Sequence, residues 1–138
     1  MILLEIYIDG ASAGNPGLSG IGVYIKGEGY DIRISEPIEP TNNHHAEFQA
    51  LVRGLEEAVK LTTGMVSVRS DSNVVVQSLE KQFIKNEQYA PYVKIALQLA
   101  EQLDFFFIKW IPDSTNKTAD ALARQAIQAQ KKAKGERP

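Results

Sequence analysis

The segment Ile2–Asp9 limits most strongly what this chain can fold into. It reads Ile-Leu-Leu-Glu-Ile-Tyr-Ile-Asp, which is rich in β-forming residues and apolar at nearly every position. A run of this kind is typical of a central strand that is covered on both faces of a sheet. We therefore expect a layered fold in which helices pack on both sides of this strand.

The rest of the chain predicts two more strands close by, and then helices and strands in alternation. Ile21–Lys26 and Tyr30–Glu36 are separated by a short glycine turn, so the first three strands are expected to form an antiparallel meander. The later elements are a helix from an N-cap at Asn43 to about Thr62, a strand over 65–70, helices over about 73–79 and 89–103, a strand over 104–111 and a helix over about 118–130. This order, βββαβααβα, predicts an α/β fold with a mixed sheet of five strands flanked by helices.

Length and composition are those of one ordinary globular domain. We expect residues 1–130 to form this domain and residues 131–138 to be a basic, flexible tail. No apolar run is long enough to cross a membrane, the N-terminus lacks the basic start of a signal peptide, and cysteine is absent, which together favour a cytoplasmic protein. The net charge of −2 argues against holding nucleic acid by charge alone, unless cations neutralise some of the acids.

Four acidic residues stand at the ends of predicted elements, and each has an ordinary structural explanation. Asp9 could begin a turn before Gly10, and Asp71 could cap the short helix that follows it. Glu47 and Asp120 could be acids favoured near the positive ends of helices. Against these explanations, Asp9 closes an apolar strand, where an isolated charge is costly, and Glu47 shares a face with apolar residues of its helix.

Taken together, the four acids favour a metal site. Carboxylates that gather in one place repel one another unless cations neutralise them. Oxygen ligands without histidine or cysteine partners suit Mg²⁺ or Mn²⁺. A pair of such ions can activate a water molecule and stabilise the leaving oxygen when a phosphodiester is cleaved.

Four segments around these acids, in the same order, resemble the ribonuclease H family, type 1. They are Asp9–Gly17, Asn43–Glu47, Ser70–Ser72 and Asn116–Ala123, and together they frame almost the whole chain. The resemblance implies the family's fold, a mixed five-stranded sheet whose second strand is antiparallel to the others. It also implies the family's activity, which is hydrolysis of the RNA strand of an RNA–DNA hybrid with two Mg²⁺ ions, for which Mn²⁺ can substitute.

The resemblance implies roles for individual residues. Asp9 would contact both metal ions, and Asp120 would help to hold the ion that activates the attacking water. Glu47 and Asp71 would hold the ion on the leaving-group side. Glu47 would also lie near the 2′-hydroxyl, by which a protein distinguishes RNA from DNA. The residues implied in binding the hybrid are Gly10, Asn15, Asn43, Ser72 and Asn73.

The chain also departs from the family's pattern. Many members carry a histidine in the loop before the last helix, but Ile111–Asn116 has none. Glu80–Tyr89 is short and holds only two lysines, unlike the basic protrusion of some members. Because the first predicted strand begins at residue 2, we expect no N-terminal hybrid-binding module. These departures leave open a catalytically weak or inactive nucleic-acid-binding module, or a related DNA-processing nuclease. We expect a monomer without an obligate protein partner.

Five other residues could be taken for functional groups. His44 and His45 stand at a predicted helix start, where we expect them to face solvent or the edge of the substrate. Trp110 lies in a phenylalanine-rich strand and is expected in the core or at its edge. Lys131 and Lys132 are expected in the solvated tail.

Overall fold

Three long strands open the chain and form the antiparallel meander that the sequence predicts. In the computed structural model, which describes residues 3–135, these strands are β1 (Leu3–Ser12), β2 (Gly17–Gly27) and β3 (Tyr30–Thr41). The later elements are α1 (Asn43–Leu61), β4 (Met65–Ser70), α2 (Asn73–Lys81), α3 (Ala90–Ala100), β5 (Phe105–Trp110), a short 3₁₀ helix (Asp113–Thr115) and α4 (Lys117–Ala133). The predicted strand start at Ile2 and the last residues of the predicted tail, 136–138, lie outside the described residues.

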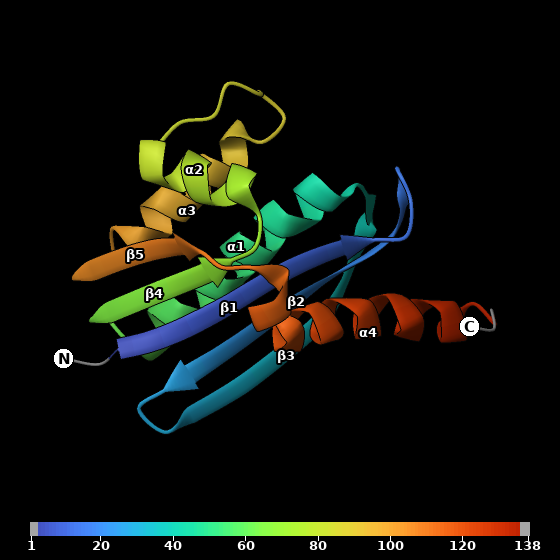
Figure 1. The fold of residues 1–138 in the computed structure, drawn as a ribbon, viewed down its shortest axis with the longest axis horizontal. Helices are drawn as coiled ribbons and strands as arrows, with labels where there is room; N and C mark the ends of the chain where they lie inside the picture. The colour runs from blue at the N-terminus through green and yellow to red at the C-terminus, as the bar shows by residue number, and fades with distance from the viewer. Residues whose placement is uncertain (1–2, 136–138) are drawn as a thin grey trace.

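The five strands form one sheet in the order β3-β2-β1-β4-β5. β1 pairs in parallel with β4, and β4 with β5, whereas β2 runs antiparallel to both of its neighbours. This arrangement confirms the predicted α/β fold, with a mixed sheet whose second strand is antiparallel to the others (Figure 1). Among residues 3–135, no helix combines the length and the apolarity that are needed to cross a bilayer.

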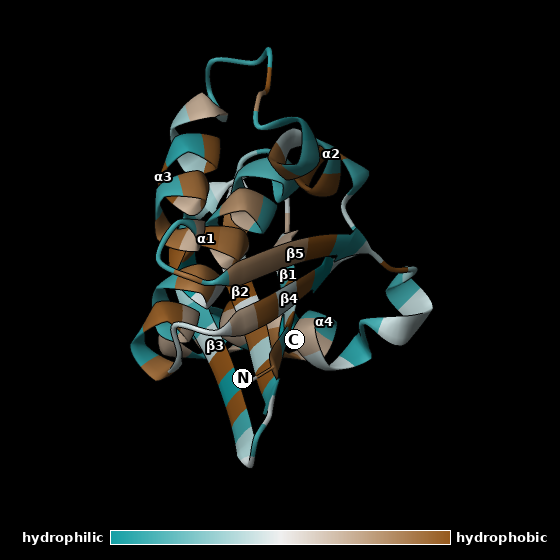
Figure 2. Cartoon of the chain, turned by 90° about the vertical axis from the view of Figure 1, so that its left-hand side faces the viewer, coloured by the Kyte–Doolittle hydropathy of each residue, from teal (hydrophilic) through white to brown (hydrophobic). Residues whose placement is uncertain are grey.

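Helices cover the sheet from two sides. α1 packs on β1 and β2, α3 packs on α1, and α2 contacts β4, β5 and both of these helices. α4 packs on β1, β2 and β3, and Figure 2 shows the sheet between α4 on one side and α1 with α3 on the other. Leu3, which alternates with the buried Leu4, is exposed. The prediction that the first strand is covered on both faces is therefore wrong for its beginning.

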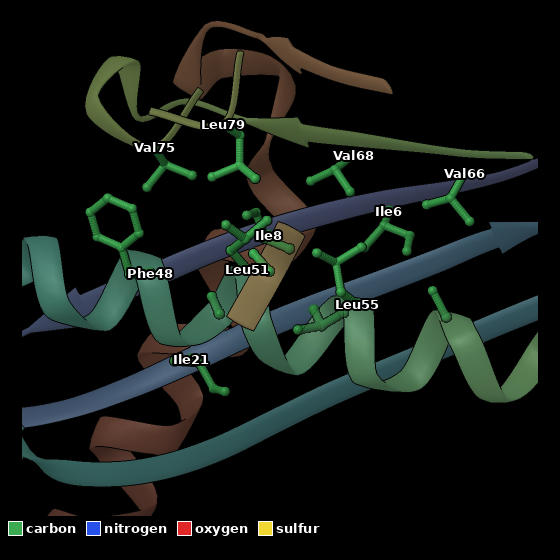
Figure 3. Packing of buried hydrophobic residues seen from close by; sticks show 14 of the residues in the cluster. Ile6, Ile8, Ile21, Phe48, Leu51, Leu55, Val66, Val68, Val75 and Leu79 are labelled. Carbon is green, nitrogen blue, oxygen red and sulfur yellow. The ribbon is translucent and has the colours of Figure 1, made fainter. Parts of the chain in front are cut away.

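The main core lies between α1 and the sheet. Phe48, Leu51 and Leu55 share one face of α1, because residues three and four positions apart lie on the same side of a helix. They point toward alternate residues of β1, among them Ile6 and Ile8 (Figure 3). All five side chains are almost fully buried, and each contributes roughly 1.5–3 kcal/mol before the cost in conformational entropy. This core fixes the start of α1 against the end of β1.

A glycine in β2 allows α4 to lie close to the sheet. A Cβ atom at Gly22 would overlap the carbonyl oxygen of Ala119, so a larger residue would push the helix away. The hydroxyl of Ser35 on β3 donates a hydrogen bond of 2.6 Å to the carbonyl oxygen of Leu122. These two contacts fix the first turns of α4, which carry Asp120, against the meander.

The first three strands are longer than the sequence predicts. β1 continues to Ser12 and β2 begins at Gly17, so the predicted loop over 10–20 shrinks to a tight turn. β3 continues through Pro37 and Pro40, which usually end a strand. It can do so because β3 lies at the edge of the sheet, where a residue without a backbone N–H is tolerated.

Helix ends and one aromatic side chain also differ from the predictions. Asn42, and not Asn43, caps α1, because its side chain accepts a hydrogen bond of 3.0 Å from the N–H of His45. α3 is shorter than predicted, and the predicted loop before the last helix contains the 3₁₀ helix. α4 continues to Ala133, so the first part of the predicted tail is helical. Trp110, at the end of the edge strand β5, is 45% exposed and belongs neither to the core nor to the side chains packed against it, so its predicted place in the core or at its edge is wrong.

Candidate metal centre

Asp9 and Asp71 meet where two parallel strands separate. The last parallel pair of β1 and β4 joins Ile8 to Ser70, so the next residue along each chain segment is one of these two aspartates. β4 ends there, whereas β1 continues beside β2. The prediction that Asp9 closes its strand is therefore wrong, because Asp9 lies inside β1. Both carboxylates lie at the C-terminal edge of the parallel strands, where α/β proteins commonly place their chemistry.

Glu47 reaches the same place from α1. It lies beyond the first turn of the helix, and not within it as predicted. A Cβ atom at Gly10 would overlap the main chain of Ala46, so the glycine lets α1 touch β1 at this point. One carboxylate oxygen from each of Asp9, Glu47 and Asp71 lies within 4.8 Å of the other two. We call these three residues the carboxylate triad.

Asp120 lines the same cavity as the carboxylate triad. α4 presents Asp120 in its first turn, as the sequence predicts. Its Oδ1 accepts a hydrogen bond of 3.1 Å from Nε of Arg124, one turn further along the helix. The cavity, which we call the acidic pocket, has a volume of about 510 Å³ and is lined by Asp120 together with the triad. The structure thus brings all four predicted acids to one place.

Burial and mutual repulsion raise the pKa values of the triad. Burial is the largest cause for Asp9, whose pKa rises from 3.8 to about 8, and the charge of Asp71 is the next. Burial also raises the pKa of Glu47 from 4.5 to about 7, although a hydrogen bond with Ser72 acts in the opposite direction. Burial raises the pKa of Asp71 as well, and a hydrogen bond with Asn116 opposes this rise. Without a cation, the site therefore retains protons that carboxyl groups in water would lose.

The donor groups of the acidic pocket fit a hard divalent cation. The triad offers carboxylate oxygens, which are the ligands that Mg²⁺ and Mn²⁺ prefer. Within residues 3–135, none of Asp9, Glu47 and Asp71 forms an ion pair with a lysine or arginine. A bound cation would supply the positive charge that these side chains lack, and it would favour their ionised forms.

Three of the five residues predicted to bind substrate lie in or beside the acidic pocket. Asn43 lines it at the start of α1, where its Oδ1 accepts a hydrogen bond of 3.0 Å from the N–H of Ser12. Gly10 also lines the pocket, but its contact with α1 already explains why this residue is a glycine. Ser72 is buried, caps α2 and hydrogen-bonds with Glu47, so it supports the site from within the protein.

Asn15 and Asn73 do not line the acidic pocket. Asn15 is exposed in the turn between β1 and β2, and Asn73 is exposed at the first position of α2. Their contacts with a hybrid stay a prediction. His45 is also absent from the pocket lining, and it packs against the rings of Tyr89 and Tyr92 where we expected it to face solvent or substrate.

Polar side chains beyond the predicted set also line the acidic pocket. Arg124, Gln128 and Lys131 follow Asp120 along α4 at intervals of three or four residues, which places them on one face of the helix. The sequence could have predicted these three residues, because their spacing places them on the same helical face as Asp120. Lys131 is therefore helical and near the site, and its predicted place in a solvated tail is wrong. Asp113 adds a further acid from the 3₁₀ helix, and no pattern in the sequence indicates it.

Known proteins are similar to this chain in both sequence and fold. A family model described as reverse transcriptase-like matches residues 8–126. The EbsB protein of Enterococcus faecalis is 41% identical over a match that covers 91% of this chain and 95% of that protein. Ribonuclease HI of Halobacterium salinarum is 33% identical over 90% of this chain, which spans 64% of that protein's length. The structure of LC11-RNase H1, isolated from compost and solved in complex with an RNA/DNA hybrid, has a TM-score of 0.84 at 32% identity and matches 92% of this chain and 98% of its own.

Proposed function

The chain belongs to the ribonuclease H family, and from this premise we propose that it is an endonuclease that hydrolyses the RNA strand of RNA–DNA hybrids with two divalent metal ions. The observation that carries the proposal is the carboxylate triad, in which Asp9, Glu47 and Asp71 come from three different parts of the fold to within 4.8 Å of one another. Asp120 lines the same pocket from α4. Acids gathered in this way serve phosphodiester hydrolysis when they hold cations.

The positions of the four acids suggest which of them would bind each cation. The charges or hydrogen bonds of all three other acids act on Asp9, which suits a ligand that both cations share. Glu47 and Asp71 would complete one cation site with it, and Asp120 would complete the other. Activation of the attacking water and stabilisation of the leaving oxygen are the chemistry that bound Mg²⁺ or Mn²⁺ supplies.

The rim of the acidic pocket carries groups that suit a nucleic-acid backbone. Arg124 and Lys131 supply positive charge, and Asn43 supplies an amide group at the start of α1. Positive groups of this kind contact phosphates without regard to sequence. The complex of LC11-RNase H1 with an RNA/DNA hybrid supports the same class of substrate for this chain. All four acids come from one chain, so we expect the monomer to be active.

A cleavage assay with labelled strands tests the proposal. The protein is incubated with an RNA–DNA hybrid labelled on either strand, with double-stranded RNA and with duplex DNA, each in the presence of Mg²⁺ or Mn²⁺. We expect internal cuts in the RNA strand of the hybrid, and none in the other substrates or in chelator. Binding of the hybrid without cleavage in either ion would favour a binding module. The absence of a histidine from Ile111–Asn116 is the observation that favours this alternative. Cuts in a DNA strand would favour a DNA-processing nuclease.

A further inference from the structure

Asn116 lies where three segments that carry acids of the site meet. It is 1% exposed and stands at the N-cap position of α4. Its Nδ2 donates to the carbonyl oxygen of Ile8 at 2.9 Å, directly before Asp9, and to Oδ2 of Asp71 at 3.2 Å. Its own carbonyl oxygen accepts a hydrogen bond of 3.1 Å from the N–H of Asp120. One buried residue thus contacts the main chain of β1, the carboxylate that follows β4 and the first turn of α4.

Helix capping does not explain the side chain of Asn116. Asn42 caps α1 and Ser72 caps α2, and each accepts a hydrogen bond from an N–H of its own helix. The side chain of Asn116 forms no such bond with α4. It donates instead to acceptors on other elements, and its buried Oδ1 has no hydrogen-bond partner within residues 3–135. The contacts of this residue therefore lie with the acids and not with its own helix.

The surroundings of Asn116 require a neutral donor. Both of its partners, the Ile8 carbonyl and the Asp71 carboxylate, are acceptors, so a reversed amide would place its oxygen against two other oxygens. An aspartate at this position would add a further negative charge beside Asp71. A lysine or arginine would place a fixed positive charge beside the acids and compete with a cation. Asparagine donates without changing the charge of the site.

We propose that Asn116 is a positioning residue that holds the carboxylate of Asp71 in place and fixes β1, β4 and the start of α4 relative to one another, so that the four acids can share bound cations. The inference rests on the function proposed above. Trp110 complements Asn116, because its indole Nε1 donates to the carbonyl oxygen of Asp71 at 3.1 Å. Asp71 is thus held at its main chain by β5 and at its carboxylate by the connection that follows β5.

Metal binding without substrate tests this role. Asn116→Ala removes both side-chain hydrogen bonds. Gln130→Ala is the matched control, because it also removes a side-chain amide that donates to a main-chain carbonyl oxygen of another element, the 2.7 Å bond from α4 to Ser19 of β2, and Gln130 does not line the acidic pocket. In calorimetric titrations of the metal-free protein, we expect Asn116→Ala to bind Mn²⁺ about tenfold more weakly or worse, as is usual when a group that orients a metal ligand is lost. We expect Gln130→Ala to bind like the wild type.

Kinetics on the hybrid give a second measure of the role of Asn116. We expect kcat to fall in Asn116→Ala at a fixed, subsaturating Mn²⁺ concentration, while KM for the hybrid stays near that of the wild type, because a buried residue does not contact the substrate. If Asn116→Ala does not fold, Asn116→Ser is titrated in its place, and weaker Mn²⁺ binding is again expected.

Two sets of results would separate this inference from the proposed function. Wild-type Mn²⁺ affinity in the Asn116 variant, or an equal loss of affinity in Gln130→Ala, would overturn the positioning role and leave the proposed function standing. Failure of the wild-type protein to bind Mn²⁺ or to cleave the hybrid would overturn the proposed function, and the inference with it.

Discussion

Asp9→Asn is expected to lower the rate of hybrid cleavage by about a thousandfold or more. The substitution keeps the shape of the side chain and an acceptor for the N–H of Gly10, but it removes a charge on which the other three acids act. A bound cation supplies several kcal/mol of transition-state stabilisation, and each loss of about 1.4 kcal/mol slows a reaction tenfold. Initial rates of RNA-strand cleavage in saturating Mg²⁺ measure the effect.

Asp31→Asn is the matched control for this experiment. Asp31 is an exposed acid that pairs with Arg33 and does not line the acidic pocket, and its substitution changes the net charge by the same amount. We expect its cleavage rate to stay near that of the wild type. A rate for Asp9→Asn within about tenfold of the wild type would contradict the role of Asp9, and equal losses in both variants would point to net charge.

Without metal, the protein is expected to lose stability as the pH rises from about 4 to about 8. The pKa of Asp9 rises from 3.8, the ordinary value of an aspartate, to about 8 in the folded protein, and the pKa of Glu47 rises from 4.5 to about 7. Between these values the folded state binds more protons than the unfolded state, so the free energy of unfolding falls as the pH rises. The loss is on the order of a few kcal/mol, and it is complete once the pH exceeds the folded-state pKa values.

Urea unfolding in chelator at several pH values measures this loss, and Asp9→Asn tests its cause. At the alkaline end of the range we expect this variant to be more stable than the wild type, because a neutral amide relieves repulsion among the acids. Saturating Mg²⁺ is expected to reverse the order, since the cation stabilises the folded state that binds it. A metal-free wild type whose stability holds or rises with pH would contradict the raised pKa values. A variant no more stable in chelator would contradict the repulsion.

The sequence predicts the fold well where its patterns are local. β4 spans Met65–Ser70 as predicted, because Gly64 and Asp71 mark the two ends of an alternating apolar run. β3 continues beyond its predicted end at Glu36, because its prolines are tolerated at an edge position that the topology decides. The exposure of Trp110 also depends on the topology of the sheet. A phenylalanine-rich strand is predicted to be buried, and only the strand order shows that β5 lies at the edge.

The four acids of the site could be predicted because each lies in a recognisable segment, but their meeting could not be derived from the segments alone. It depends on the register that pairs Ile8 with Ser70 and so brings the next residues of both strands together. Asn116 belongs to one of the predicted segments, yet its contact with Asp71 joins residues far apart in the chain. Asp113 lines the pocket from a short 3₁₀ helix, which the sequence predicts to be an ordinary loop.

Proton release on metal binding tests most directly whether the acidic pocket holds cations. Mn²⁺ is titrated into the metal-free protein at neutral pH in two buffers of different ionisation enthalpy, and the difference in heat gives the number of protons released. Because the pKa values of Asp9 and Glu47 are about 8 and about 7 without metal, we expect the wild type to release roughly one to two protons on binding, and Asp9→Asn to bind more weakly and release fewer. Absence of Mn²⁺ binding, or binding that releases no proton and is the same in Asp9→Asn, would contradict the proposed metal site.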